Sequence, residues 1–299
     1  MKILGSYKNG NYIVTLFDDG TKIRDSGKTD TFIPAFAENC DVKITDKCDG
    51  GCQFCYEGCT VNGKHGDIMN AKFIDTLHPL TELALNGNDL SHPDLIPFLE
   101  KLHEKRVIAN LTVNQKHFEK NYDFLKDLVD KHLIFGLGIS LVNATDDFVK
   151  KVKPFKNAVI HTINGILTES DINVLKNNDL KILVLGYKQL RRGVDFYDEN
   201  KDEIVRNQKW LYDNIQSITE LFDAVSFDNL AIEQLNIRRL MTEDEWNEFY
   251  MGDDGTVTFY IDLVENKFAK NSLSQERYNL LDSIDDMFNI IISKNTKVA

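Results

Sequence analysis

The sequence of 299 residues lacks several features that would assign it to a common class of protein. No stretch approaches 18 consecutive apolar residues, so we expect no membrane-spanning helix. The N-terminus, MKILGSYKNGNY, has neither an apolar signal region nor a cleavage site, which favours a cytoplasmic protein. A G-x-S-x-G nucleophile elbow, a P-loop and a G-x-G-x-x-G turn are also absent, which leaves no sign of the chemistry those motifs support.

The chain also lacks a basic stripe. Its formal net charge is −12, and acidic residues are spread along its whole length. A protein that grips a phosphodiester backbone usually clusters lysine and arginine, so this composition disfavours a long nucleic-acid partner. A solvated acidic surface is the simplest interpretation.

No linker, low-complexity segment or repeat divides the chain, and short apolar strands alternate with helical segments. This alternation predicts parallel βαβ units arranged as a partial or full (β/α) barrel. The expected strands are 41–45, 82–86, 107–113, 133–142, 158–163, 180–186, 223–227 and 256–264. The expected helices are 93–105, 116–131, 146–152, 170–177, 199–221 and, at the end, 275–293.

The first residues have a different pattern. Asn9-Gly10 and Asp19-Gly20 flank alternating apolar residues, which predicts a β-hairpin over residues 1–24. We therefore expect an N-terminal β-hairpin appendage within residues 1–30 and a (β/α) barrel domain over 38–299, with a C-terminal cap and helix. Chemistry in such barrels occurs at the carboxyl ends of the strands. The hairpin and residues 247–267 are the expected covers of that site.

Four of the five cysteines lie within twelve residues, in CDGGCQFCYEGC. In a reducing cytosol such a cluster indicates metal ligands or catalytic thiols rather than disulfides. A structural zinc site usually has two well-separated cysteine pairs, which this crowded loop does not offer. Cys48, Cys52, Cys55 and Cys59 together approach a ferredoxin-type spacing, although no proline follows and no second set exists. Cys40 lies apart, just upstream.

A third interpretation uses only Cys48, Cys52 and Cys55. Their C-x₃-C-x₂-C spacing, with the aromatic Phe54 before the last cysteine, resembles the signature of the radical S-adenosylmethionine (SAM) superfamily. Three thiolates can hold three irons of a [4Fe–4S] cluster and leave the fourth iron open to a ligand. The two glycines after Cys48 let the loop fold closely. The resemblance implies a [4Fe–4S] cluster, SAM, and a motif that follows the first barrel strand, as it does here.

Later segments match the superfamily in order over residues 41–190. Asn86-Gly87-Asn88-Asp89 stands where a glycine-rich turn meets SAM, with asparagines in place of a glycine and a glutamate. LTVN ends the third strand, Ser140 the fourth, and INGI the fifth. The residues so matched to cofactor binding are Phe54, Tyr56, Asn86, Gly87, Asn88, Asp89, Asn114, Ser140, His161, Asn164 and Gly165.

Substrate contacts are expected from the later strands. YKQLRRG carries the densest basic patch at the active end of a strand, which suits a phosphate or carboxylate. Polar residues follow or alternate along the last strands. The candidate substrate or catalytic residues are Lys188, Arg191, Arg192, Asp228, Asn229, Tyr260, Asp262 and Cys59.

The sequence therefore predicts a single-cluster radical SAM enzyme that abstracts hydrogen from a small polar substrate. With too few cysteines for a second cluster, a modified nucleoside or its 5′-phosphate fits, as in lyases that release queuine from queuosine. A flavodoxin or ferredoxin is the electron donor that the resemblance implies. Three alternatives stay open: a peptide- or protein-modifying member, a ferredoxin-like electron carrier, and a SAM sensor without catalysis.

Overall fold

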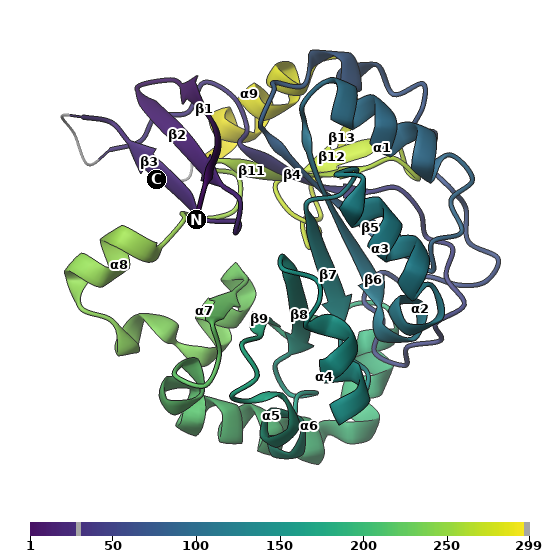
Figure 1. Cartoon of the computed structure of the whole chain (residues 1–299), viewed down its shortest axis with the longest axis vertical. Coiled ribbons are helices and arrows are strands. Elements are labelled where there is room, and N and C mark those ends of the chain that lie inside the picture. Colours follow the sequence, from purple (N-terminus) through teal and green to yellow (C-terminus); the bar gives the residue numbers. More distant parts are fainter. Residues whose placement is uncertain (28–30, 296–299) are drawn as a thin grey trace.

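A mostly parallel ten-stranded sheet forms the centre of the molecule, in a computed structural model that describes residues 1–27 and 31–295 (Figure 1). Seven parallel strands follow one another in chain order. They are β4 (Asn39–Lys43), β5 (Glu82–Asn88), β6 (Ile108–Asn114), β7 (Gly136–Ser140), β8 (Ala158–Ile163), β9 (Lys181–Leu185) and β10 (Ala224–Phe227). Residues 28–30 and 296–299 of the two predicted ranges lie outside the described residues.

Three further strands extend the sheet beyond β4. β11 (Thr258–Asp262) pairs parallel with β4, and β12 (Lys267–Ala269) and β13 (Tyr278–Asn279) follow antiparallel. Each of the eight predicted strand segments overlaps one of β4 to β11, so the α/β prediction is confirmed. Within the described residues β10 pairs only with β9 and β13 only with β12, so the sheet is open and not a closed barrel.

Helices connect the parallel strands and lie along their outer side (Figure 1). The connecting helices are α1 (Leu95–Glu104), α2 (Gln115–Lys120), α3 (Tyr122–Asp130), α4 (Asp146–Val152), α5 (Glu169–Leu175) and α6 (Arg192–Thr219). After β10 come α7 (Asn229–Leu235) and α8 (Glu243–Phe249), and α9 (Ile284–Asn295) follows β13; η1 (Lys72–Thr76) and η2 (Ile237–Leu240) are 3₁₀ turns. The start predicted for the last helix is wrong, because residues 275–283 form a loop and β13 before α9 begins.

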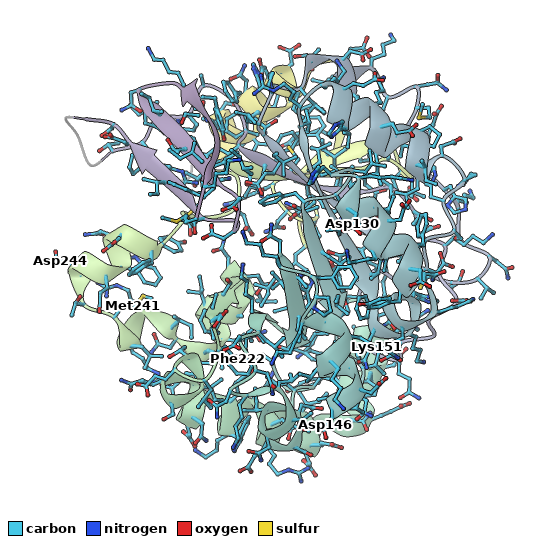
Figure 2. The ribbon with its side chains drawn as sticks, in the orientation of Figure 1. Asp130, Asp146, Lys151, Phe222, Met241 and Asp244 are labelled. Carbon is cyan, nitrogen blue, oxygen red and sulfur yellow. The ribbon has the colours of Figure 1, made fainter. Side chains whose placement is uncertain are left out.

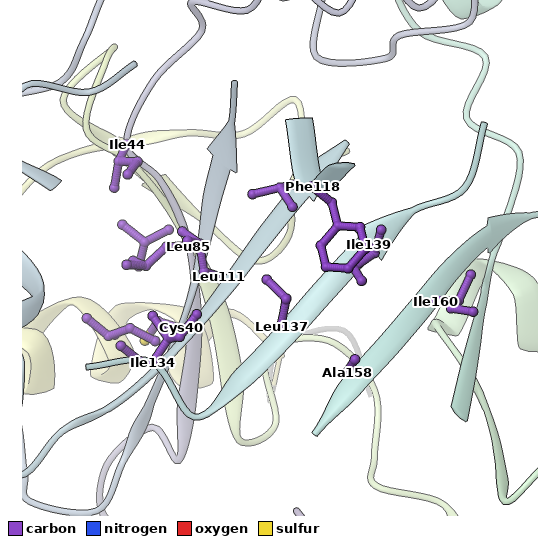
Figure 3. Packing of buried hydrophobic residues seen from close by; sticks show 14 of the residues in the cluster. Cys40, Ile44, Leu85, Leu111, Phe118, Ile134, Leu137, Ile139, Ala158 and Ile160 are labelled. Atoms are coloured by element: carbon purple, nitrogen blue, oxygen red, sulfur yellow. The ribbon is translucent and has the colours of Figure 1, made fainter. Parts of the chain in front are cut away.

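Strand residues alternate between two environments. Leu85, Leu111 and Ile160 are completely or almost completely buried against the helices, in the core drawn in Figure 3. Residues one position away, such as Thr112 and Ser140, are only half-buried on the opposite side, which we call the inner face. Side chains of a strand point alternately to its two faces, so helices cover one face and leave a polar, accessible one.

Charged side chains of the helices point outward, as Asp130, Asp146 and Lys151 do in Figure 2. On α4, Lys151 pairs with Asp147 one turn earlier at 2.8 Å. These helices are therefore amphipathic, with the apolar stripe on the sheet. No helix in the described part of the chain is long and apolar enough to cross a membrane.

The N-terminal residues form a separate three-stranded sheet of β1 (Ile3–Asn9), β2 (Tyr12–Phe17) and β3 (Lys22–Asp25). Asn9 and Tyr12 pair across the first turn, where Gly10 takes the left-handed conformation (φ 56°) that tight turns require. The predicted hairpin is thus confirmed and gains a third strand.

This small sheet covers the amino ends of the parallel strands. Lys22 pairs at 2.6 Å with Glu82, the first residue of β5, and Arg24 pairs at 2.8 Å with Glu38, which precedes β4. Lys181, the first residue of β9, donates to the carbonyl oxygen of Asp19 at 2.8 Å. The expectation that the hairpin covers the active site is wrong, because its charged residues bind partners at the opposite edge.

Candidate functional site

The clustered cysteines occupy the long connection between β4 and β5, at the carboxyl edge of the sheet. We call residues 48–59 the cysteine loop. Isolated bridges between Thr45 and His65 and between Lys47 and Thr60 close the connection on itself. Cys48, Cys52 and Cys55 are half-buried, so their thiols are reachable but sheltered.

Polar groups are directed at these sulfur atoms. The Gly50 N–H donates to Cys48 Sγ at 3.3 Å, and Asn114 Nδ2 donates to Cys52 Sγ at 3.4 Å. The hydrogen bond with Cys59 lowers the pKa of Cys55. Burial raises the pKa values of Cys48 and Cys52. Donors of this kind stabilise a thiolate, which is the form that binds metal.

The other two cysteines differ from these three. Cys40 is buried in the core on β4 and fills space there, which agrees with the packing role expected of small apolar residues. Cys59 is also buried, but it hydrogen-bonds Cys55 and accepts from Asn88 Nδ2 at 3.5 Å. The hydrogen bond with Cys55 and burial raise the pKa of Cys59. A fourth thiol therefore lies beside the three.

The segment predicted as the SAM turn forms the end of β5 and supports the start of the connection that carries the cysteine loop. Asn86 Oδ1 accepts from the Ile44 N–H at 2.7 Å, and its Nδ2 donates to the Thr45 carbonyl oxygen at 2.8 Å. Asn88 Nδ2 donates to the same carbonyl oxygen at 3.1 Å. The strand bulges at Gly87, where a Cβ would lie 2.7 Å from Leu111. These asparagine side chains thus bind protein backbone.

Asp89, the last residue of that turn, begins the connection to α1. Its Oδ1 accepts from the Ser91 N–H at 3.0 Å.

The two arginines of the basic patch also bind the cysteine loop. Arg192 donates from Nε to the Cys52 carbonyl oxygen at 3.2 Å and from Nη1 to the Cys59 carbonyl oxygen at 2.9 Å. Arg191 Nη1 donates to the carbonyl oxygen of Glu57. The sequence predicts that these arginines lie at the carboxyl edge of the sheet, but it does not predict that they bind the cysteine loop. The predicted basic patch is divided, because Lys188 contacts other residues than the two arginines do.

Lys188 joins Tyr56 and Asp228 on the inner face. Its Nζ lies 4.2 Å from the centre of the Tyr56 ring and 3.9 Å from Asp228 Oδ2. Asp228 also accepts from the Gly186 N–H at 2.8 Å and caps α7. Burial raises the pKa of Asp228. Three residues predicted separately thus form one group, which we call the lysine group.

A small pocket of about 20 Å³ lies between the cysteine loop and the carboxyl ends of β8 and β9. Phe54 and Tyr56 contribute aromatic rings from one side, and Ile163 and Leu185 contribute aliphatic side chains from the other. Lys188 provides a charged group. Apolar surfaces with one polar group suit a flat heterocycle.

The remaining predicted cofactor residues lie along the same edge. Ser140 ends β7, Asn114 ends β6 and caps α2, and His161 lies on β8 beside Ser140. Burial lowers the pKa of His161 to about 4, so the ring is neutral at pH 7. His161 packs over Gly138, where a Cβ would lie 2.5 Å from the ring.

Two predicted residues follow β8 directly. Asn164 is 1% exposed, and its Nδ2 donates to Gln234 at 3.0 Å. Its Oδ1 has no hydrogen-bond partner among the described residues. Gly165 has a φ of 96°, and its carbonyl oxygen accepts from Asn207 at 3.2 Å.

The last predicted residues form a second group. Asn229 Nδ2 donates to Asp254 at 2.7 Å, which places part of the predicted cover 247–267 beside β10. Tyr260 and Asp262 are buried on β11, where Asp262 lies 3.8 Å from Lys43 and 3.7 Å from Arg277. Tyr260 and Asp262 are therefore held by neighbouring cations rather than by the lysine group.

Sequence reasoning missed Asp41. This residue lies on β4 between β5 and β11, yet its side chain is exposed on the inner face. The surrounding protein removes water from the Asp41 carboxyl group and so raises its pKa to about 6, although the positive charge of Lys188 acts to lower it. The signal was present in DVKIT, because buried Val42 and Ile44 alternate with Asp41 and Lys43.

No protein-family model matches the chain, and no curated protein matches it. Among solved structures, the chain is similar to the crystal structure of SuiB from Streptococcus suis, with a TM-score of 0.51 and 15% sequence identity. The similarity covers 83% of this chain, and the chain spans only 64% of the length of SuiB. At this level of identity, the two proteins share a fold.

Proposed function

We propose that this protein is a radical SAM enzyme in which Cys48, Cys52 and Cys55 hold a [4Fe–4S] cluster. One observation carries the proposal. Three half-buried thiols on one loop lie at the carboxyl edge of a parallel sheet, beside a pocket shared by Phe54 and Tyr56 of that loop. Ligands in open α/β sheets bind outside the carboxyl ends of the strands. The partial-barrel form that the resemblance implies is part of this proposal.

The donor set fits the cluster. Within the described residues no three His, Cys, Asp or Glu side chains converge on one point as a single bound metal ion requires. In a [4Fe–4S] cube each thiolate binds a different iron, so three cysteine ligands need not converge on one point. The donors to Cys48 and Cys52, and the backbone contacts of Arg192, supply the surrounding hydrogen bonds that tune such sites.

Each group of residues then has a role. The pocket between Phe54 and Leu185 would hold the adenine ring of SAM, with Lys188 at its edge. When bound, the cluster and SAM supply the one-electron cleavage that produces a 5′-deoxyadenosyl radical. Asp41, whose pKa is about 6, can hold or release a proton on its carboxylate near neutral pH, facing a polar substrate on the inner face. Electrons would come from a flavodoxin or ferredoxin.

A four-thiolate electron carrier is the second candidate, because Cys59 hydrogen-bonds Cys55. The position of the thiols beside this pocket favours the radical SAM proposal over this one, since an electron carrier needs no ligand site next to its cluster. The queuosine-lyase reaction stays a prediction, as do the peptide-modifying and sensor alternatives.

Electron paramagnetic resonance tests the proposal. We would reconstitute the protein with iron and sulfide under anaerobic conditions, reduce it, and record spectra with and without SAM. A reduced-cluster signal that SAM alters supports an open iron. A signal that SAM leaves unchanged contradicts the proposal and favours the electron carrier.

A further inference from the structure

A second, larger pocket lies on the other side of Tyr56 and is used by none of the roles above. Its volume is about 200 Å³, enough for a ligand built on one aromatic ring. Tyr56 and Tyr260 line it, and Arg191 and Arg277 reach it from different segments. The two pockets share Tyr56, so a ligand in the second lies next to the first.

The charges around this pocket are unbalanced. Lys43 pairs with Glu57 at 3.1 Å and lies near Asp262, and all three side chains are mostly buried. The guanidinium groups of Arg191 and Arg277 lie 3.9 and 3.7 Å from these two carboxylates, beyond hydrogen-bond distance. Three cations therefore meet two carboxylates, which leaves an excess of positive charge in a chain of net charge −12.

The two arginines retain N–H groups for a ligand. Arg191 uses Nη1 on the Glu57 carbonyl oxygen, and its side chain is 52% exposed. Arg277 donates from Nε to Ser274 and from Nη2 to Ser272 carbonyl oxygens at 3.3 and 2.9 Å, which fixes its plane. A fixed guanidinium with spare N–H groups is suited to a phosphate or carboxylate.

The side chains that line the second pocket favour a ligand with an aromatic ring next to its anionic group. Arg277 lies over the Tyr260 ring, with 5.3 Å from Cζ to the ring centre, and Ser272 hydrogen-bonds Tyr56. Both tyrosines are thus held in place, and ordered aromatic side chains favour stacking with planar ligands.

From these contacts we propose that the second pocket binds a small cyclic ligand carrying a phosphate or carboxylate, with Arg191 and Arg277 holding the anion. That this ligand is the substrate rests on the proposed function, because the shared Tyr56 places it beside the adenine pocket. The binding itself does not depend on a cluster.

Phenyl phosphate is the probe, because it joins a ring to a phosphate. We would titrate it into the full-length protein by calorimetry and compare phenol, the same ring without charge. Arg191→Gln and Arg277→Gln should each weaken phenyl phosphate binding at least about tenfold, since each removes charge-assisted hydrogen bonds. Arg206→Gln, an exposed arginine on α6, is the matched control and should leave the affinity unchanged.

Two further measurements show whether phenyl phosphate binds in the second pocket. Leu190→Trp fills the pocket from its lining and should abolish binding even if Arg277→Gln fails to fold. Excess 5′-deoxyadenosine, aimed at the first pocket, should leave phenyl phosphate affinity unchanged. Equal affinity for phenol, unchanged affinity in the arginine or Leu190 variants, or displacement by 5′-deoxyadenosine would overturn the proposal. SAM cleavage is scored separately, so binding without cleavage supports the pocket and rejects only the proposed function.

Discussion

Individual side chains around the cysteine loop divide into those that can bind metal and those that hold the loop. Cys48, Cys52 and Cys55 are half-buried, whereas Cys59 is buried and bound to Asn88 and Cys55. Arg192 ties two carbonyl oxygens of the loop to the start of α6. The three-thiolate account therefore predicts different effects for these residues.

Replacing Cys59 by serine should leave the cluster in place. Cys59→Ser is nearly isosteric, and the three proposed ligands remain. Iron and sulfide content after reconstitution should match the unmodified protein, whereas Cys48→Ser, Cys52→Ser and Cys55→Ser should each lose most of it. Loss of the cluster in Cys59→Ser would instead establish a four-thiolate site.

Replacing Arg192 by glutamine should loosen the loop. The change removes hydrogen bonds to Cys52 and Cys59 carbonyl oxygens and should cost about 1–3 kcal/mol of unfolding free energy. Urea unfolding of the cluster-free protein measures this, with Arg206→Gln as the control. An unfolding free energy equal to that of the control would show that the arginine does not secure the loop.

Spacing predicts three of the thiols as cluster ligands, but it does not give the roles of the residues that contact the cysteine loop from distant segments. Arg191 and Arg192 were predicted to hold substrate, and both bind backbone carbonyl oxygens of the cysteine loop. Asn86 was predicted to contact SAM, and its amide bonds Ile44 and Thr45. Sequence patterns give the edge on which a side chain lies, whereas its partners depend on loops that are distant in sequence.

The strands and helices could be predicted from the sequence more accurately than the way in which they pack against one another. All eight strand segments were found, because each is a short apolar run bounded by polar residues. The start of α9 was predicted too early, because residues 275–283 mix polar residues with Leu280 and Leu281 as a helix would, whereas part of this segment pairs with β12 as β13. The location of the N-terminal sheet could not be inferred, because it depends on ion pairs between segments without local signals.

Those ion pairs give a test at the level of the element. Glu38 is completely buried and binds Arg24 at 2.8 Å, Lys22 at 3.5 Å and the Tyr12 hydroxyl at 2.6 Å. Glu38→Gln should cost about 3–5 kcal/mol of unfolding free energy, because it leaves the mostly buried Arg24 without its carboxylate partner, whereas Lys22 keeps Glu82. Glu203→Gln, exposed on α6, is the matched control. A loss of unfolding free energy no larger than that of Glu203→Gln would contradict the conclusion that these ion pairs hold the N-terminal sheet in place.

Acid should weaken the same contact. Burial alone would raise the pKa of Glu38, but the hydrogen bond and charge of Arg24 and the charge of Lys22 hold it below the ordinary value of 4.5. The ionised form is therefore stabilised by folding. Its contribution should be complete above pH 4.5 and should be lost as pH falls below that value. Urea unfolding across this range should show the free-energy difference between unmodified protein and Glu38→Gln shrinking with acid; a growing difference would refute the sign.

In the whole molecule, the N-terminal sheet lies apart from the candidate functional site. The N-terminal sheet covers the amino edge of the strands, while the cysteine loop and both pockets lie at the carboxyl edge. A ligand of the first pocket should therefore leave the distant sheet unchanged.

Hydrogen–deuterium exchange can test this separation. Addition of 5′-deoxyadenosine should slow exchange in peptides that cover residues 52–58 and 185–188, because they line the first pocket. Peptides from residues 1–27 should exchange at an unchanged rate. Protection confined to the N-terminal sheet would place the ligand at the wrong edge.

The most direct test of the central claim is to measure SAM cleavage. The protein would be reconstituted with iron and sulfide, reduced with dithionite under anaerobic conditions, and given SAM, with 5′-deoxyadenosine quantified by chromatography. The account predicts 5′-deoxyadenosine from the unmodified protein and from Cys59→Ser, and none from Cys52→Ala. A reconstituted cluster that yields no 5′-deoxyadenosine would contradict it.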